Sequence, residues 1–343
     1  MRYRSPSPRS TTLPFAVLVL TLSTLATGAC ASRHALAPRP TAEVAGIAWL
    51  APAEESDRAS LDRWERVVGP PVVHVRQGAP PQERELVLVS WNAALGEGNV
   101  VALVADLLRT DAERAFVLLI QEAYRGGLAT TAAASNAAFA RRHGGRLPDI
   151  VAIAERFRLN LYYVPSMRNG APAQSDQDRG NAILSTLPLE ELTAIELPYE
   201  RQRRVAVAAT VRLRSSDGEL HALRLVSAHL DNRVGARRLW FPGGLFARAR
   251  QARALVEALR DEDAAVLAGD FNSWLGFGDI AVRETLEDFP DTPLTDGRPT
   301  FRNLLRLDHL FARVPDGWSI SSTRGSRRYG SDHWPLVATI RAR

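Results

Sequence analysis

The most constraining feature of this sequence is a repeated design in which an apolar strand ends abruptly in polar side chains. From residue 85 onward, apolar runs rich in β-branched residues alternate with longer amphipathic stretches. Several of these runs stop at residue types that bind metal ions or move protons. The six such ends are Trp91-Asn92, Gln121-Glu122, His229-Leu230-Asp231, Gly269-Asp270-Phe271-Asn272, Leu307-Asp308-His309 and Ser331-Asp332-His333.

The hydrophobic periodicity predicts many strands with a few helices between them. Strands are expected at residues 86–90, 115–120, 159–164, 182–187, 205–214, 221–229, 264–269, 307–311 and 336–340. Helices are expected at residues 100–109, 150–157, 246–259 and 279–287, with a short one at 59–68. This pattern indicates a two-layered β core flanked by helices, in one domain of roughly 250 residues.

Carboxylates are prominent among the strand ends. A carboxylate that leaves a buried strand costs several kcal/mol unless it is paired, hydrogen-bonded or bound to a cation. One strand-end aspartate usually caps the next helix, but Glu122, Asp270, Asp308 and Asp332 all occupy such positions. If their strands share a sheet edge, the gathered negative charge requires a cation. Oxygen ligands without cysteine favour Mg²⁺, with Mn²⁺ or Ca²⁺ as alternatives, over zinc.

In this order, the six motifs resemble the endonuclease/exonuclease/phosphatase superfamily, whose fold is that of deoxyribonuclease I. They extend from residue 91 to residue 333 and so cover nearly the whole predicted domain. The resemblance implies an α+β fold, a four-layered α/β sandwich with two packed, mostly antiparallel β-sheets and helices on the outer faces. It also implies an active site at one edge of the sandwich and metal-dependent hydrolysis of a phosphate ester.

The resemblance assigns metal ligands and catalytic groups residue by residue. Asn92 and Glu122 would hold the divalent ion, with Asp270 and Asp332 as further ligands. Asp270 would also position or deprotonate the attacking water.

The remaining catalytic roles fall on two histidines and their neighbours. His229 would stabilise the scissile phosphate or act as general acid, and Asn272 would donate to a phosphate oxygen. His333 would stabilise developing charge or exchange protons, with Asp308 orienting its imidazole. Because alternation along a strand sends Asp308 and His309 to opposite faces, His309 is expected to be structural.

Two further residues are candidates for substrate binding. Asn181 lies in Gly180-Asn181-Ala182, which resembles a segment that places an asparagine near the phosphate in several branches of the superfamily; the alternative is a turn that leads into a strand. Arg204 is the last residue of the run Arg201-Gln202-Arg203-Arg204 and precedes a strand, whereas the rest of that run is expected to be solvated.

The N-terminal segment has the form of an export signal. Three arginines precede residue 10, residues 13–25 are apolar, and small residues lead to Cys30, the one cysteine of the chain. The apolar stretch is too short to span a bilayer comfortably and is typical of a secretory signal. We therefore expect residues 1–29 to be a signal peptide, 30–84 a partly ordered tether and N-terminal extension, and 85–343 the catalytic domain.

The small residues before Cys30 resemble a bacterial lipobox, although Thr27 stands where leucine is usual. Lipidation at Cys30 would anchor the protein to a membrane of the bacterial envelope, in the periplasm or at the outer membrane. Ordinary signal cleavage near Ala29, followed by secretion, is the alternative interpretation.

The charge balance bears on the substrate. The chain contains no lysine, and without the three arginines that precede residue 10 it has 40 arginines against 38 acids. A dedicated binder of long nucleic acid usually has a stronger basic excess. Nucleic acid, a phospholipid headgroup and a soluble phosphoester all remain candidate substrates, and no obligate protein partner is predicted. A catalytically inactive binding protein of the same fold, or a structural envelope lipoprotein, is the alternative function.

Overall fold

The structure is a computed structural model that describes most of the chain after residue 34. It describes residues 35–39, 46–66, 68–77, 84–110, 114–126, 149–168, 177–232, 240–294 and 296–342. The predicted signal peptide and Cys30 lie outside the described residues.

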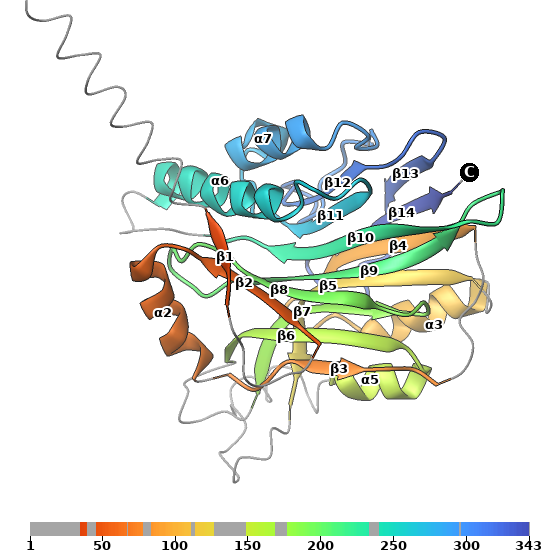
Figure 1. Cartoon of the computed structure of the whole chain (residues 1–343), viewed down its shortest axis with the longest axis horizontal. Helices are drawn as coiled ribbons and strands as arrows, with labels where there is room; N and C mark the ends of the chain where they lie inside the picture. The colour runs from red at the N-terminus through yellow and green to blue at the C-terminus, as the bar shows by residue number, and fades with distance from the viewer. Residues whose placement is uncertain are drawn as a thin grey trace, which may run out of the picture.

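Two mixed, mostly antiparallel seven-stranded sheets pack face to face (Figure 1). The first sheet has the order β1 (Leu36–Pro38), β2 (Ala48–Pro52), β8 (Glu190–Glu196), β9 (Val205–Arg214), β10 (Leu220–His229), β11 (Ala265–Asp270) and β12 (Asp308–Arg313). The second has the order β13 (Ser319–Arg324), β14 (Leu336–Arg341), β4 (Glu85–Asn92), β5 (Ala115–Arg125), β7 (Asp178–Ser185), β6 (Asn160–Arg168) and β3 (Val72–His74).

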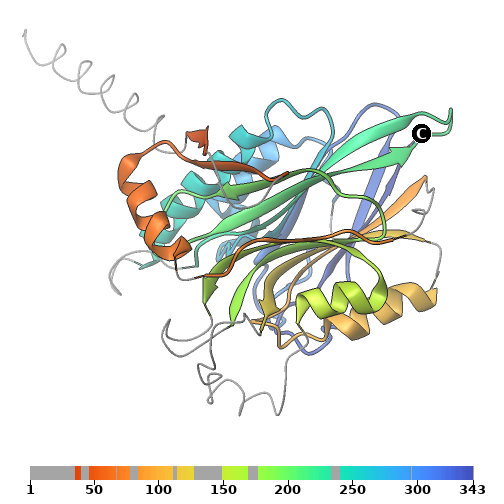
Figure 2. The same ribbon diagram turned by 60° about the horizontal axis from the view of Figure 1, so that its bottom comes forward.

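Helices cover the outer face of each sheet (Figure 2). Helices α6 (Trp240–Ala258) and α7 (Ile280–Asp288) cover the first sheet, and α3 (Val100–Thr110) and α5 (Ile150–Phe157) cover the second. The result is the four-layered α/β sandwich that the sequence predicted. Among the helices of the described residues, none combines the length and apolar character needed to cross a bilayer.

The side-chain alternation of β4 shows why its sequence requires two apolar layers. Leu86 and Leu88 pack between the two sheets, whereas Val87 and Val89 pack under α3 and α5. Because successive side chains of a strand point to opposite faces, a strand that is apolar at every position must be covered on both sides. The long apolar runs of the sequence therefore correspond to central strands.

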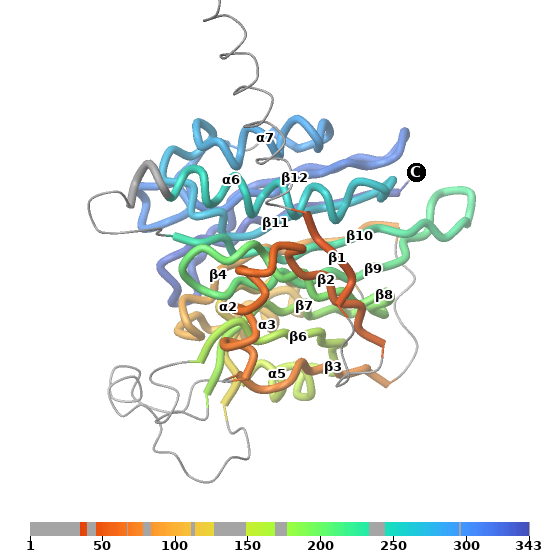
Figure 3. The backbone as a smooth tube through the Cα atoms, turned by 60° about the vertical axis from the view of Figure 1, so that its left-hand side comes forward, coloured from red at the N-terminus to blue at the C-terminus, as the bar shows by residue number. Residues whose placement is uncertain are grey.

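Elements upstream of residue 85 belong to this packed unit. Strands β1 and β2 extend the first sheet, β3 pairs with β6, and α2 (Glu55–Glu65) packs beside β2 (Figure 3). The segment was expected to be a partly ordered tether with a helix at residues 59–68. The three strands have only three to five residues each, too few for a period of two to stand out in the sequence.

Strand register brings the predicted site residues to one edge. Strands β4 and β5 are parallel with Asn92 opposite Gln121, and β10 and β11 are parallel with His229 opposite Asp270. Strand β12 runs antiparallel to β11, so its first residue, Asp308, lies opposite Asp270. Parallel neighbours end at the same sheet edge, which is why polar strand ends that are distant in sequence meet here.

Candidate functional site

A hydrogen bond between Asn92 and Asp270 joins the two sheets at this edge. Asn92 Nδ2 donates to Asp270 Oδ2 at 2.9 Å, and both side chains are buried. Asn92 Oδ1 accepts from the backbone N–H of Ala94 at 2.9 Å. The Nδ2 group of Asn92 thus orients Asp270. Asn92 was predicted to be a metal ligand, and a second lone pair of Asn92 Oδ1 remains for a cation.

Glu122 reaches the site through an irregularity in β5. The β5–β7 register shifts between Ile120 and Ala123, and Glu122 lies in this bulge with φ of 54°. A bulge re-aims a side chain, and a left-handed backbone at a non-glycine residue is a strained feature that clusters at functional sites. The backbone N–H of Leu95, itself at φ 60°, donates to Glu122 Oε2 at 2.8 Å.

The loop that carries His333 is fastened to the end of β4. Trp91 Nε1 donates to the His333 carbonyl at 3.2 Å, and Ser331 Oγ donates to the Asn92 carbonyl at 2.7 Å. The same hydroxyl accepts from the His333 N–H at 3.0 Å. These three bonds place the imidazole next to the strand that supplies Asn92.

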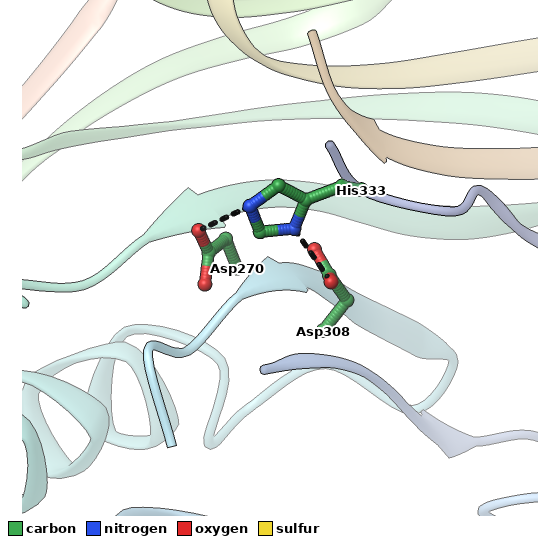
Figure 4. Close-up of side chains that lie close together, drawn as sticks. All are labelled: Asp270, Asp308 and His333. Atoms are coloured by element: carbon green, nitrogen blue, oxygen red, sulfur yellow. Dashed lines mark hydrogen bonds and ion pairs between the residues drawn. The ribbon is translucent and has the colours of Figure 1, made fainter. Parts of the chain in front are cut away.

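His333 lies between two carboxylates (Figure 4). Its Nδ1 is 2.8 Å from Asp308 Oδ2 and its Nε2 is 3.8 Å from Asp270 Oδ2. The backbone N–H of Asp308 donates to Thr300 Oγ1 at 3.1 Å, and the Phe301 ring lies 4.9 Å from the imidazole. The orientation of His333 by Asp308, implied by the resemblance, matches this geometry.

The protonation states of His333 and Asp270 follow from their burial and from the charges of neighbouring side chains. Burial alone would lower the pKa of His333, but the carboxylates of Asp308, Asp270 and Asp332 outweigh it and raise that pKa to about 10. Burial is the main reason that the pKa of Asp270 rises to about 7, and the charge of Asp308 adds to it. At neutral pH the site therefore holds an imidazolium beside a carboxylate that is ready to take up a proton.

The second histidine has the opposite character. His229 Nε2 is 3.5 Å from Asp270 Oδ2, and its Nδ1 is 3.9 Å from Glu122 Oε1. Burial, followed by the positive charges of Arg204, His333 and Arg179, lowers the pKa of His229 well below its usual value. His229 is therefore neutral at physiological pH, with one N–H to donate.

Two other predicted residues make mainly supporting contacts. The backbone N–H of Asn272 donates to Asp270 Oδ1 at 2.8 Å, and Asn272 Nδ2 donates to the Leu230 carbonyl at 3.0 Å. Asp332, predicted to be a metal ligand, pairs with Arg302 at 3.1 Å, and its Oδ1 is 3.9 Å from His333 Nε2.

His309 points away from Asp308, as expected, and its Nε2 contacts Ser273 Oγ at 2.7 Å.

Of the two predicted substrate-binding residues, Asn181 lies on β7 opposite the β5 bulge that carries Glu122, and Arg204 directly precedes β9. Asn181 Nδ2 donates to the Val205 carbonyl at 2.7 Å, and its buried Oδ1 has no hydrogen-bond partner among the described residues. Arg204 is buried with its Nε 3.4 Å from Asp231 Oδ1. Its positive charge is one of the causes that lower the pKa of the His229 imidazole.

Sequence reasoning did not single out Arg179, Ser331 or Thr300 as site residues. Arg179 precedes Asn181 by two positions on β7, so it shares that face, and its charge interacts with Glu122. The period of two along a strand, counted back from Asn181, could have identified Arg179 from the sequence. The roles of Ser331 and Thr300 depend on contacts between distant segments, and the sequence carries no local signal for them.

The donor set of this edge fits a hard divalent cation. Asp270, Asp308 and His333 each offer a ligand atom within 4.8 Å of the others, and Asp308 Oδ1 is buried without a hydrogen-bond partner among the described residues. His333 is protonated at neutral pH and so is a poor ligand. The carboxylates of Glu122 and Asp270, with the Asn92 amide oxygen, are the donors that Mg²⁺ or Mn²⁺ prefers.

Comparisons with known proteins identify the family and agree with the fold. Residues 89–333 match the sequence profile of the Endonuclease/Exonuclease/phosphatase family. Solved structures of an endonuclease/exonuclease/phosphatase from Beutenbergia cavernae and of a family protein from Leptotrichia buccalis are similar to this chain. Their TM-scores are 0.54 and 0.51 at 18% and 15% identity, over 76% and 74% of this chain and 72% and 99% of theirs. At such identities the likeness shows the fold alone.

A curated relative is more similar in sequence but over a shorter stretch. The chain is 34% identical over 151 residues, 42% of its length, to a UPF0294 protein of Vibrio cholerae. It spans about half the length of the curated relatives it matches, 47% for this one.

Proposed function

Because the chain belongs to the endonuclease/exonuclease/phosphatase family, whose members are commonly metal-dependent phosphoester hydrolases, we propose that it hydrolyses a phosphate ester with the help of Mg²⁺. The observation that carries this proposal is the position of Asp270. Its carboxylate lies 3.5 Å from the neutral imidazole of His229 and 3.8 Å from the charged imidazole of His333. A base flanked by one neutral and one cationic donor suits displacement at phosphorus.

Each side chain has a defined part in the proposed reaction. Asp270 accepts a proton from the water that attacks phosphorus. His333, held protonated by Asp308, supplies positive charge and gives its Nε2 proton to the leaving oxygen as the P–O bond breaks. His229 donates an N–H to a non-bridging phosphate oxygen, together with Asn272.

The cation would be held by Glu122 and Asp270, with Asn92 and Asp332 as further oxygen donors. Such an ion supplies a positive charge to the phosphate oxygens and lowers the pKa of a bound water. Arg204 and Asn181 would contact the anionic substrate. Asn181 Nδ2 donates one hydrogen to the Val205 carbonyl, which leaves its second hydrogen for a phosphate oxygen.

The proposed location is outside the cytoplasm. The basic, apolar and small-residue pattern before Cys30 supports export, and the cysteine itself supports a lipid anchor in the bacterial envelope. Signal-peptide cleavage and lipidation are testable by intact-mass measurement of the protein purified from membranes.

A panel assay with and without Mg²⁺ tests the proposed activity. Purified protein would be incubated with bis(p-nitrophenyl) phosphate, plasmid DNA, single-stranded RNA and sphingomyelin. We expect hydrolysis of at least one substrate, loss of activity on chelation, and a fall of about 10²–10⁴-fold in Asp270→Asn and His229→Ala. The exposed carboxylate of Asp288 on α7 offers a matched control, Asp288→Asn. Equal rates in wild type, Asp270→Asn and His229→Ala would contradict the proposed mechanism.

A further inference from the structure

Two short turns border the site at the first sheet. Residues 273–278 follow Asn272, and residues 301–305 precede Asp308. The ring of Phe301 lies 4.9 Å from the His333 ring. The first turn touches the residue that follows the second, because Ser273 Oγ donates to the Arg306 carbonyl at 2.9 Å and the Arg306 guanidinium lies 4.5 Å from the centre of the Phe277 ring.

These turns expose large apolar side chains beside a polar site. Leu304 is 78% exposed, Leu275 49% and Phe277 48%. They are three of the eight large apolar side chains that are exposed in the described part of the chain. Single exposed apolar residues need no explanation, but a group at the rim of an active site indicates a contact surface.

Both turns are fixed by hydrogen bonds and so hold these side chains outward. In the first, Gly276 N–H donates to the Ser273 carbonyl at 2.7 Å and Gly278 N–H to the Leu275 carbonyl at 3.0 Å. In the second, Leu304 N–H donates to the Phe301 carbonyl at 2.9 Å.

The second turn departs from usual turn chemistry. Arg302 and Asn303 have φ of 47° and 60°; asparagine adopts this left-handed conformation readily, whereas for arginine it is uncommon. Glycine and polar residues dominate turns, yet leucine follows these two residues at the exposed tip. When the surrounding structure holds a residue in a position that its type does not usually favour, that position is often part of a functional surface.

We propose that Leu275, Phe277 and Leu304 form a docking rim that inserts into the surface of a phospholipid bilayer. This inference deepens the proposed function and rests on it, since the site beside the rim would then act on the phosphodiester of a lipid headgroup. Two guanidinium groups lie beside these side chains: Arg306 is beneath Phe277, and the exposed Arg302, which also pairs with Asp332, is next to Leu304. Arginines at this level would meet anionic headgroups.

The chemistry of the rim favours a bilayer over other occupants. Nucleic acid would need several aromatic stacking platforms along a basic groove, whereas the rim has one aromatic ring, Phe277, beside two leucines. A stable protein interface buries roughly 1,200–2,000 Å² with a well-packed core, more than these three side chains provide. Apolar side chains that project from rigid turns among arginines match the interfacial zone of a membrane.

A site-specific fluorescent label tests the proposal in the full-length chain. Cys30 is the sole cysteine, so Cys30→Ser with Leu304→Cys gives one thiol for an environment-sensitive dye. The matched control is Leu220→Cys. Leu220 is 50% exposed and begins β10 at the β9–β10 hairpin, at the other end of the strand from His229 (Figure 1). The probe is a vesicle of equimolar phosphatidylcholine and phosphatidylglycerol.

We expect vesicles to shift the emission of the label at position 304 to the blue and to protect it from iodide, with neither effect at position 220. Tethering through the N-terminus alone would not distinguish the two positions. Equal responses at both positions, or a shift at 304 produced by single-stranded DNA and not by vesicles, would overturn the proposal. Phe277→Cys repeats the test if labelling at position 304 disturbs the fold.

Failure of this inference is distinguishable from failure of the proposed function. Label insertion requires no turnover, whereas hydrolysis of bis(p-nitrophenyl) phosphate in solution requires no membrane. Loss of insertion with hydrolysis retained would reject the docking rim alone. We further expect Phe277→Ser with Leu304→Ser to keep wild-type hydrolysis of the soluble substrate; loss of that activity would assign the turns to the site itself and also reject the rim.

Discussion

Asp308 and His333 form a buried pair in which Asp308 Oδ2 lies 2.8 Å from His333 Nδ1, although 25 residues separate them. The pair exists because β12 starts opposite the end of β11, and because Ser331 fastens the His333 loop to β4. It keeps a positive charge next to Asp270 at neutral pH.

The charge of His333 should therefore depend on Asp308. Asp308→Asn keeps a hydrogen-bond partner but removes the negative charge that raises the pKa of His333. We expect that pKa to fall and kcat at neutral pH to drop by about 10²–10³-fold, as for loss of a general acid. An NMR titration of the imidazole together with steady-state kinetics checks this. An unchanged pKa with wild-type turnover would show that Asp308 has no such role.

Removal of Glu122 charge should weaken cation binding more than it disturbs the fold. In Glu122→Gln the Leu95 N–H keeps an oxygen acceptor, since the amide retains one. We expect the Mg²⁺ concentration for half-maximal activity to rise about 10–100-fold, with little change in melting temperature of the metal-free protein. The hydrolysis rate measured at increasing Mg²⁺ concentrations gives this half-maximal concentration. A wild-type metal requirement in Glu122→Gln would place the cation elsewhere.

The buried, neutral imidazole of His309 should make the folded protein less stable at acid pH. Burial, followed by the charge of Arg306, lowers the pKa of His309 to about 3 from an ordinary value of 6.5. The folded state thus prefers the neutral ring, so this contribution is fully present above pH 6.5 and is lost as pH falls toward 3, by at most roughly 5 kcal/mol. Urea unfolding of wild type and His309→Gln across this range checks the sign. A variant whose stability falls as steeply as wild type would contradict it.

Gly269 should be irreplaceable because backbone packs where a side chain would stand. A Cβ at Gly269 would lie 1.8 Å from the Ala228 carbonyl oxygen, and its φ is +152°. We expect Gly269→Ala to destabilise the fold by about 3 kcal/mol or more and to displace Asp270. Gly218, at φ +94° with nothing within 4 Å, is the matched control, because Gly218→Ala meets only backbone strain of about 1 kcal/mol. Equal unfolding midpoints for the two variants would refute this account.

The sequence predicted the layers of the fold because long apolar runs, such as residues 115–120, require cover on both faces. That polar strand ends meet at one edge was expected only if the strands share a sheet, and the resemblance to the family supplied the set of residues. The short strands β1 to β3 were not predicted, because three to five residues carry too little periodicity.

At the site, residue types were predictable but contacts were not. Nothing local in the sequence shows that the Asn92 amide group donates to Asp270, or that Asp332 pairs with Arg302. The left-handed bulge that aims Glu122 depends on the neighbouring strand, and the low pKa of His229 depends on burial and on arginines from other elements. Such features arise only from tertiary packing.

The most direct test of the central claim measures hydrolysis of bis(p-nitrophenyl) phosphate as Mg²⁺ is added back to chelator-treated protein, in wild type and in Asp270→Asn. We predict no turnover before addition, a saturable rise in wild type, and a response at least about 10²-fold weaker in Asp270→Asn. Turnover that persists in the presence of chelator, or a wild-type response in Asp270→Asn, would show that this edge of the sandwich is not a metal-dependent hydrolytic centre.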